Sequence, residues 1–261
     1  MRRVDLVSWS WISLGETIIV DKISHSVKRK QALSAPFPET RDALYRSRPK
    51  AILLASNPAP LPTLTRLLSQ SAPFIVIDAC VLMSSIVRRL MLRLADAGIF
   101  HPVWSERIGE EWRRNAARLW EVDPAFLAQQ WADMNTRFPS AMEHDTQAYE
   151  AVLRYSDPKD FHVIAAGLAR RARCGLQQPP VVQVATWNLK DFNRSELRRQ
   201  GLDAFNPDIL ISRWHGAHPG LVAEAVAQVP QDYVSLGRDP EPLAMTLQRE
   251  RLYRVKSLTA Q

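Results

Sequence analysis

FIVIDACVLMSS, residues 74–85, is the stretch that decides the fold. Its first four residues, from Phe74 to Ile77, form a compact apolar run that is typical of a buried β-strand. Asp78 ends the run, and Leu, Met and Ile then recur at helical spacing through residues 81–97. The segment therefore predicts a strand that leads into a helix, with an aspartate at the carboxyl end of the strand.

Further along the chain, helical patterns alternate with another apolar strand. Helices are predicted over residues 105–119 and 124–138. A third is predicted over 161–172, where the side chain of Asp157 can cap the start. Residues 181–186 predict a second buried strand. This alternation is typical of an α/β domain with a mainly parallel sheet.

The basic charge of the chain is concentrated near its start. The formal net charge is +7, but residues 1–73 hold 11 Lys and Arg against 5 Asp and Glu, and the remaining residues hold 23 against 22. No sustained period of 2 or 3.6 residues crosses this segment. We interpret residues 1–73 as a weakly ordered extension or as upstream translated sequence, in preference to an RNA-binding arm.

Cysteine usage and hydropathy favour a reducing compartment. Cys80 and Cys174 belong to no CxxC pair, which argues against a disulfide framework and against a cysteine zinc site. No apolar run approaches the roughly 18 residues that span a bilayer, and no export signal follows the first basic residues. We therefore expect a cytoplasmic protein that does not enter a membrane.

Acidic side chains follow the predicted strands, at the edge where open parallel sheets bind ligands. Asp78 follows the first strand, and Asn188 and Asp191 follow the second. Asp160, at the start of the 161–172 helix, can point at the same edge or cap the helix. Converging carboxylates repel one another unless a cation joins them, and Mg²⁺ prefers oxygen ligands. These residues predict a metal site that hydrolyses phosphate esters.

Five segments form a set of motifs: FIVIDACVLMSS at 74–85, VWSERIGEEWRRN at 103–115, DPKDFHVIAAGLA at 157–169, TWNLKDF at 186–192 and FNPDILI at 205–211. Together they resemble the PIN-domain family, and in particular its branch of VapC-like toxins. They occur in the order and spacing of that family and cover roughly half of the chain, which makes the match more specific than any single short motif.

The resemblance implies a PIN-like three-layer α/β/α domain over residues 74–211, with a helical C-terminal tail over 212–261. In the tail, helical segments are predicted near residues 221–229 and 241–251. Carried over by motif, the metal-binding and catalytic acids are Asp78, Glu111, Asp160 and Asp191, with Thr186 and Asn188 in supporting roles. Glu110 stays the alternative to Glu111, because adjacent helical residues point about 100° apart.

The same resemblance implies a function. We expect an endoribonuclease dependent on Mg²⁺ or Mn²⁺, the toxin of a type II toxin–antitoxin pair, which leaves a 5′-phosphate and a 3′-hydroxyl. Its partners would be RNA, a cognate antitoxin protein and a second copy of the chain in a homodimer. The alternative is a non-catalytic RNA- or protein-binding module with the same fold. We discount a haloacid-dehalogenase phosphatase, because it needs a second aspartate two residues after Asp78, where Cys80 stands.

Basic residues beside the predicted acids have two interpretations. Arg113, Arg114 and Arg118 can hold RNA phosphate or form an ordinary exposed helix face. His162 can approach phosphate or pack in the interior.

Overall fold

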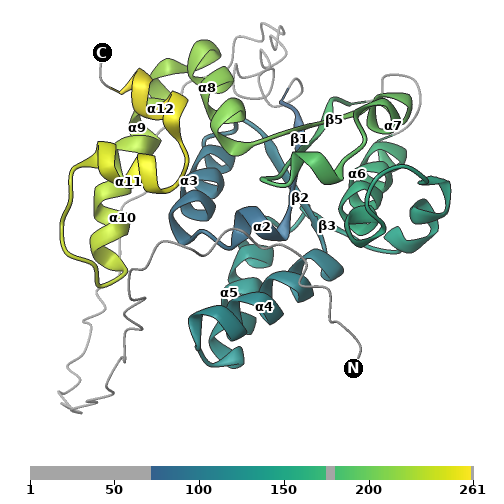
Figure 1. Ribbon diagram of the computed structural model, residues 1–261, viewed down its shortest axis with the longest axis horizontal. Helices are drawn as coiled ribbons and strands as arrows, with labels where there is room; N and C mark the ends of the chain where they lie inside the picture. Colours follow the sequence, from purple (N-terminus) through teal and green to yellow (C-terminus); the bar gives the residue numbers. More distant parts are fainter. Residues whose placement is uncertain (1–71, 175–179, 260–261) are drawn as a thin grey trace, which may run out of the picture.

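The computed structural model describes residues 72–174 and 180–259 (Figure 1). All of the predicted extension over 1–73 except its last two residues lies outside this part. The strands are β1 (Phe74–Ile77), β2 (His101–Ser105), β3 (Met142–Glu143), β4 (Val182–Ala185) and β5 (Leu202–Phe205).

Most of the described chain is helical. Three 3₁₀ turns, η1 (Thr146–Val152), η2 (Pro158–Asp160) and η3 (Leu189–Asp191), accompany the α-helices. The α-helices are α2 (Ala79–Leu82), α3 (Ser85–Asp96), α4 (Glu106–Trp120), α5 (Pro124–Arg137), α6 (Phe161–Arg173), α7 (Arg194–Arg199), α8 (Pro207–Ala217), α9 (Pro219–Ala227), α10 (Val229–Ser235), α11 (Leu243–Arg249) and α12 (Tyr253–Leu258). Within the described ranges, every helix is too short or too polar to cross a bilayer.

The five strands form one parallel sheet in the order β3-β2-β1-β4-β5. This confirms the predicted α/β class and the parallel sheet. The chain first builds outward from β1 to β2 and β3, and then returns to place β4 on the other side of β1. The direction of winding therefore reverses between β1 and β4, and the crevice at the carboxyl ends of such a strand pair is where doubly wound sheets bind ligands.

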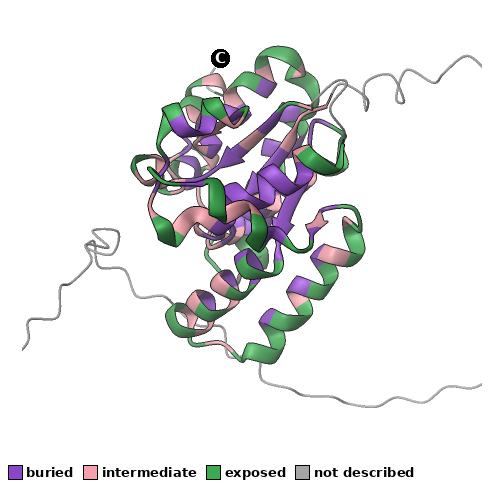
Figure 2. Ribbon diagram, turned by 90° about the vertical axis from the view of Figure 1, so that its right-hand side faces the viewer, coloured by how far each residue is buried: buried purple, intermediate pink, exposed green. Residues whose placement is uncertain are grey.

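Helices lie on both faces of the sheet. α6 packs on one face against β1, β2 and β4, while α3 lies on the other face with α8 and α9 beside it (Figure 1). The helical pair α4 and α5 projects beyond the sheet, with its buried side chains on the inner faces (Figure 2). β1 is buried from Ile75 to Ile77 and reads as a continuous apolar run, as expected for a central parallel strand. Gln183 interrupts the apolar pattern of β4, and β5 is only half-buried after Leu202.

The predicted single helix over residues 81–97 is wrong in one respect, because the structure divides it into α2 and α3. Ser84 has an extended backbone, with ψ at 114°, and its hydroxyl accepts a hydrogen bond from the Val87 amide at 3.0 Å. This N-cap starts a new helix and interrupts the apolar pattern that had indicated one continuous element.

The helices that follow residue 212 share the hydrophobic core of the sheet. Leu247, Leu252 and Val255 are fully buried in the same cluster as β1. Asp208 accepts hydrogen bonds from the backbone amides of Arg254 and Val255 at 3.0 and 3.1 Å. Helix α8 runs across the point where the tail was predicted to begin, and the two helical segments predicted after it correspond to α9 and α11.

Candidate active site at the carboxyl edge of the sheet

Asp78 and Thr186 occupy equivalent places at the ends of neighbouring strands. Ile77 of β1 pairs in register with Ala185 of β4, so the next residue of each strand comes to the same point of the edge. The Asp78 amide continues the ladder by donating to the Ala185 carbonyl at 3.1 Å. This is the strand pair at which the winding of the sheet reverses, so the sequence places a carboxylate at the predicted ligand-binding crevice.

The Asp78 carboxylate is buried, with 2% of the residue exposed, and it is held by three donors. The Thr186 hydroxyl donates to Oδ2 at 2.6 Å. Cys80 donates its thiol to Oδ2 at 3.0 Å and its amide to Oδ1 at 3.4 Å. Burial raises the pKa of Asp78 above its usual value, these hydrogen bonds oppose that rise, and repulsion from Glu111 adds to it.

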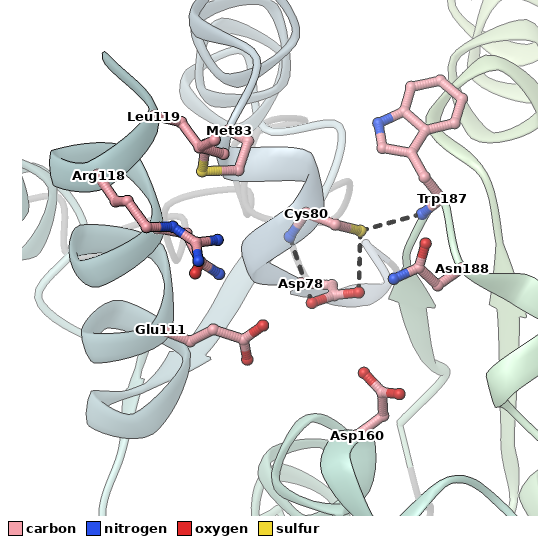
Figure 3. Close-up of a pocket in the computed structure, with 10 residues that line it drawn as sticks. Asp78, Cys80, Met83, Glu111, Arg118, Leu119, Asp160, Trp187 and Asn188 are labelled. Carbon is pink, nitrogen blue, oxygen red and sulfur yellow. Dashed lines mark hydrogen bonds between the residues drawn. The ribbon is translucent and has the colours of Figure 1, made fainter. Parts of the chain in front are cut away.

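Asp160 faces the same space from the start of α6. Asp157, and not Asp160, forms the side-chain cap, since its carboxylate accepts from the Lys159 amide at 3.0 Å. The Asp160 carboxylate makes no capping hydrogen bond and is left free to point toward Asp78 (Figure 3). Burial raises the pKa of Asp160 to about 7, and repulsion from Asp78, Asp191, Glu111 and Asp157 contributes to the rise.

Helix α4 supplies the third carboxylate. Its buried face, Ile108, Gly109, Trp112 and Ala116, packs inward and turns Glu111 toward Asp78 (Figure 3). Glu111 Oε2 lies 3.0 Å from His162 Nε2. The neighbouring Glu110 is exposed and does not line the space between the aspartates.

Asp78, Glu111 and Asp160 line one cavity of about 360 Å³ (Figure 3). Asn188 lies on the rim beside Asp78 and is the fourth predicted residue in this lining. The remaining lining residues are Cys80, Met83, Asn115, Arg118, Leu119 and Trp187.

Three of these lining residues share a helical spacing that could have identified them. Asn115, Arg118 and Leu119 stand four, seven and eight residues after Glu111, on one face of α4. Trp187 and Met83 carry no such signal, because their place in the wall depends on how the strand ends and α2 come together.

The other two predicted residues lie beside the cavity and not in its lining. Thr186 is fully buried behind Asp78, and its Oγ1 also accepts from the Asn188 amide at 3.0 Å. Asp191 is half-buried in η3, where its carbonyl accepts from the Asp157 amide at 2.8 Å. Its carboxylate acts on the cavity through repulsion of Asp160.

The donors suit a hard divalent cation in kind but are spread apart. Carboxylate and amide oxygens are the ligands of Mg²⁺ and Mn²⁺, and the shared repulsion on Asp160 is what a cation would relieve. Among the residues that the structure describes, no three His, Cys, Asp or Glu side chains lie close enough together to hold an ion by themselves.

Comparison of the chain with models of protein families, with curated proteins and with solved structures finds no match.

Proposed function

We propose that this chain is a metal-dependent endoribonuclease of the PIN type. The observation that carries the proposal is the meeting of Asp78, Glu111 and Asp160, from three distant parts of the sequence, around one cavity at the carboxyl edge of a parallel sheet. Burial, together with repulsion from these and neighbouring acids, raises the pKa of Asp160 to about 7. A site where burial and mutual repulsion disfavour the ionised carboxylates is typical of one that works with a bound cation.

The cation would be Mg²⁺ or Mn²⁺, held by Asp78, Glu111 and Asp160, with Asp191 adding negative charge nearby. Mg²⁺ commonly keeps several of its waters and uses one or two carboxylates together with substrate phosphates. It therefore does not require three carboxylates in direct contact. Once bound, such an ion activates water and stabilises the charge on a phosphodiester.

The chain's own residues orient the site and the substrate. Thr186 fixes the Asp78 carboxylate through a 2.6 Å hydrogen bond. Arg118 lines the acid cavity and has no ion-pair partner among the residues in the described ranges, so it is free to bind a phosphate oxygen. Met83, Leu119 and Trp187 give the cavity an apolar wall against which a nucleobase can pack.

The partners follow from the same proposal. The substrate would be RNA in the cytoplasm, the activity would be silenced by a cognate antitoxin protein, and the active form would be a homodimer.

A second candidate is a non-catalytic RNA- or protein-binding module. The spacing of the carboxylates favours it, because within the described part of the chain no three of them are close enough to hold an ion unaided. The two candidates differ in whether RNA is cut.

The deciding experiment incubates the purified full-length chain with a mixed RNA pool, with Mn²⁺ or with EDTA. Asp78→Asn and Asp160→Asn are the test variants. Asp133→Asn is the matched control, because Asp133 is exposed on α5 and, within the described ranges, forms a hydrogen bond with Gln129 alone. We expect metal-dependent cleavage by the wild type and the control, and a loss of activity of at least about 100-fold in both test variants. Replacing a residue that only hydrogen-bonds to a metal ligand already lowers metal affinity or activity by about 10–100-fold. RNA bound equally by all four proteins and cut by none would support the binding module.

A further inference from the structure

A second cavity, also of about 360 Å³, opens on α4 next to the acid cavity. The two share Glu111 and Asn115, so they meet at the side chain that closes one wall of the acid site. The remaining residues around the second cavity are Arg107, Glu110, Arg114, Lys159 and His162. We call this the basic cavity.

Two of its cations are free to bind an anion. Arg114 and Lys159 are exposed and have no side-chain ion pair or hydrogen bond with any residue in the described ranges. Arg107 is held differently, because its guanidinium pairs with Glu150. The basic cavity therefore presents two unpaired positive charges within one hollow, with Glu110 at its side.

His162 lies in the wall between the basic cavity and Glu111. The residue is 4% exposed, and its Nε2 lies 3.0 Å from Glu111 Oε2. Among the described residues, neither ring nitrogen has a partner that meets the geometry of a hydrogen bond. An imidazole carries at least one N–H, so this ring places a polar group next to the wall that the two cavities share.

We propose that the basic cavity binds one backbone phosphate of the substrate strand, adjacent to the phosphodiester that lies among the acids. This rests on the proposed function, which supplies the strand. Arg and Lys form charge-assisted hydrogen bonds to phosphate oxygens, and grooves that bind single strands combine such cations with surfaces for stacked bases. The basic cavity supplies the cations, and the apolar wall of the acid cavity supplies the stacking surface.

The geometry assigns a role to each cavity along one strand. Because Glu111 and Asn115 form a shared wall, a strand lying over α4 enters both cavities in succession. A phosphate fixed in the basic cavity sets which linkage reaches Asp78 and Asp160. The basic cavity thus determines the register of cleavage, while the acids carry the chemistry.

The test measures binding of a fluorescent single-stranded RNA to the full-length chain in EDTA, where metal-dependent cleavage does not occur. The double variant Arg114→Gln/Lys159→Gln removes both free cations. Arg254→Gln/Lys256→Gln is the matched control, because it removes the same charge from α12, which lies far from α4 in Figure 1. Affinity is measured for each protein over a series of salt concentrations.

We expect the test variant to bind the RNA about tenfold or more weakly, as for loss of charged hydrogen bonds. The magnitude of its slope of log affinity against log salt concentration should fall by about 0.7, the value for one single-strand phosphate contact. The control keeps the wild-type slope. A series of RNAs, each with one neutral methylphosphonate in place of one phosphate, locates the contact. When the neutral linkage replaces the phosphate that the basic cavity binds, the wild type and the test variant should bind that RNA with equal affinity. Inorganic phosphate, added against chloride at equal ionic strength, shows whether a free phosphate occupies the cavity instead.

An unchanged slope in the test variant, or the same effect in the control, would overturn the proposal. The proposal would also be overturned if no single methylphosphonate made the wild type and the test variant bind equally. It would be overturned as well if inorganic phosphate competed with RNA while the test variant still bound RNA as tightly as the wild type. Failure of the proposed function gives a different pattern. Wild-type protein that binds RNA through the basic cavity but never cuts it contradicts the nuclease and leaves the phosphate site standing, whereas a wild type that binds no RNA contradicts both.

Discussion

Thr186 Oγ1 donates a hydrogen bond of 2.6 Å to Asp78 Oδ2, and so joins two residues that are 108 positions apart in the sequence. The contact links the carboxyl ends of β1 and β4, where the winding of the sheet reverses. The same hydroxyl accepts from the Asn188 amide at 3.0 Å, which fixes the turn that carries Asn188 to the rim of the cavity. One buried side chain therefore positions residues on both sides of the crevice.

Replacing Thr186 by Val should lower activity without removing an acid. The change keeps the shape of the side chain but leaves the Asn188 amide without its acceptor and Asp78 without its shortest donor. We expect about 10–100-fold slower cleavage, as for residues that orient metal ligands, and about 1–3 kcal/mol lower free energy of unfolding. The assay is the Mn²⁺ concentration that gives half-maximal cleavage, which should rise. Thr186→Ser keeps the hydroxyl and should stay near wild type, and equal losses in both variants would contradict the role of the hydrogen bond.

Asp160 should make the metal-free protein less stable as the pH rises. Its pKa is about 7 in the folded protein and 3.8 in the absence of the fold, so the folded protein binds the proton more tightly. The stabilising contribution is complete below about pH 4 and is lost as the pH passes through about 7. Asp160→Asn should therefore raise the free energy of unfolding more at pH 8 than at pH 5, measured by urea denaturation in EDTA. A gain of the same size at both pH values would contradict this prediction.

Divalent metal should stabilise the folded protein through the same acids. A ligand that binds only the folded state stabilises it by about 2.7 kcal/mol at one hundred times its dissociation constant. We expect the thermal unfolding midpoint of the wild type to rise steadily with Mn²⁺ or Mg²⁺, and this rise to be absent in Asp78→Asn. An identical rise with NaCl at matched ionic strength would show that the effect is screening and not binding at this site.

Gly109 should be required for the close approach of α4 to α5. A Cβ at this position would lie 2.3 Å from Trp131 Cζ2, and Trp131 is only 6% exposed and so has little room to move. Gly109→Ala gains about 1 kcal/mol of helix propensity, but overpacking a buried contact costs about 1–3 kcal/mol. We expect a net loss of stability by chemical denaturation. Gly216→Ala in α8 is the control, because its added Cβ would meet no described residue within 4 Å beyond its own turn of helix, and it should be neutral or stabilising.

Much of the fold could be predicted because its signals are local. β1 is a buried apolar run, β4 is buried except at Gln183, and the cap at Asp157 marks the start of the turn before α6. The division between α2 and α3 was missed, because it depends on the backbone of Ser84 and not on the apolar period.

The parts of the structure that could not be predicted depend on contacts between distant residues. Ser84 donates to Glu250 at 2.5 Å across 166 positions, and Arg93 donates to both carboxylate oxygens of Asp232 at 2.8 and 2.9 Å. No local pattern marks these pairs. The site shows the same division, since Asp78 was predicted from the strand before it, while Trp187 and Met83 joined the cavity only through tertiary packing.

The most direct test compares two adjacent glutamates of α4 in one cleavage assay. Glu111 lines the acid cavity and Glu110 does not. Metal-stripped wild type, Glu111→Gln and Glu110→Gln are given one defined single-stranded RNA while Mn²⁺ is titrated. We predict that cleavage by the wild type and Glu110→Gln rises with Mn²⁺ to a plateau and leaves 5′-phosphate ends, and that Glu111→Gln stays at background. Cleavage in EDTA, or equal cleavage by both variants, would contradict a metal-dependent nuclease built on Asp78, Glu111 and Asp160.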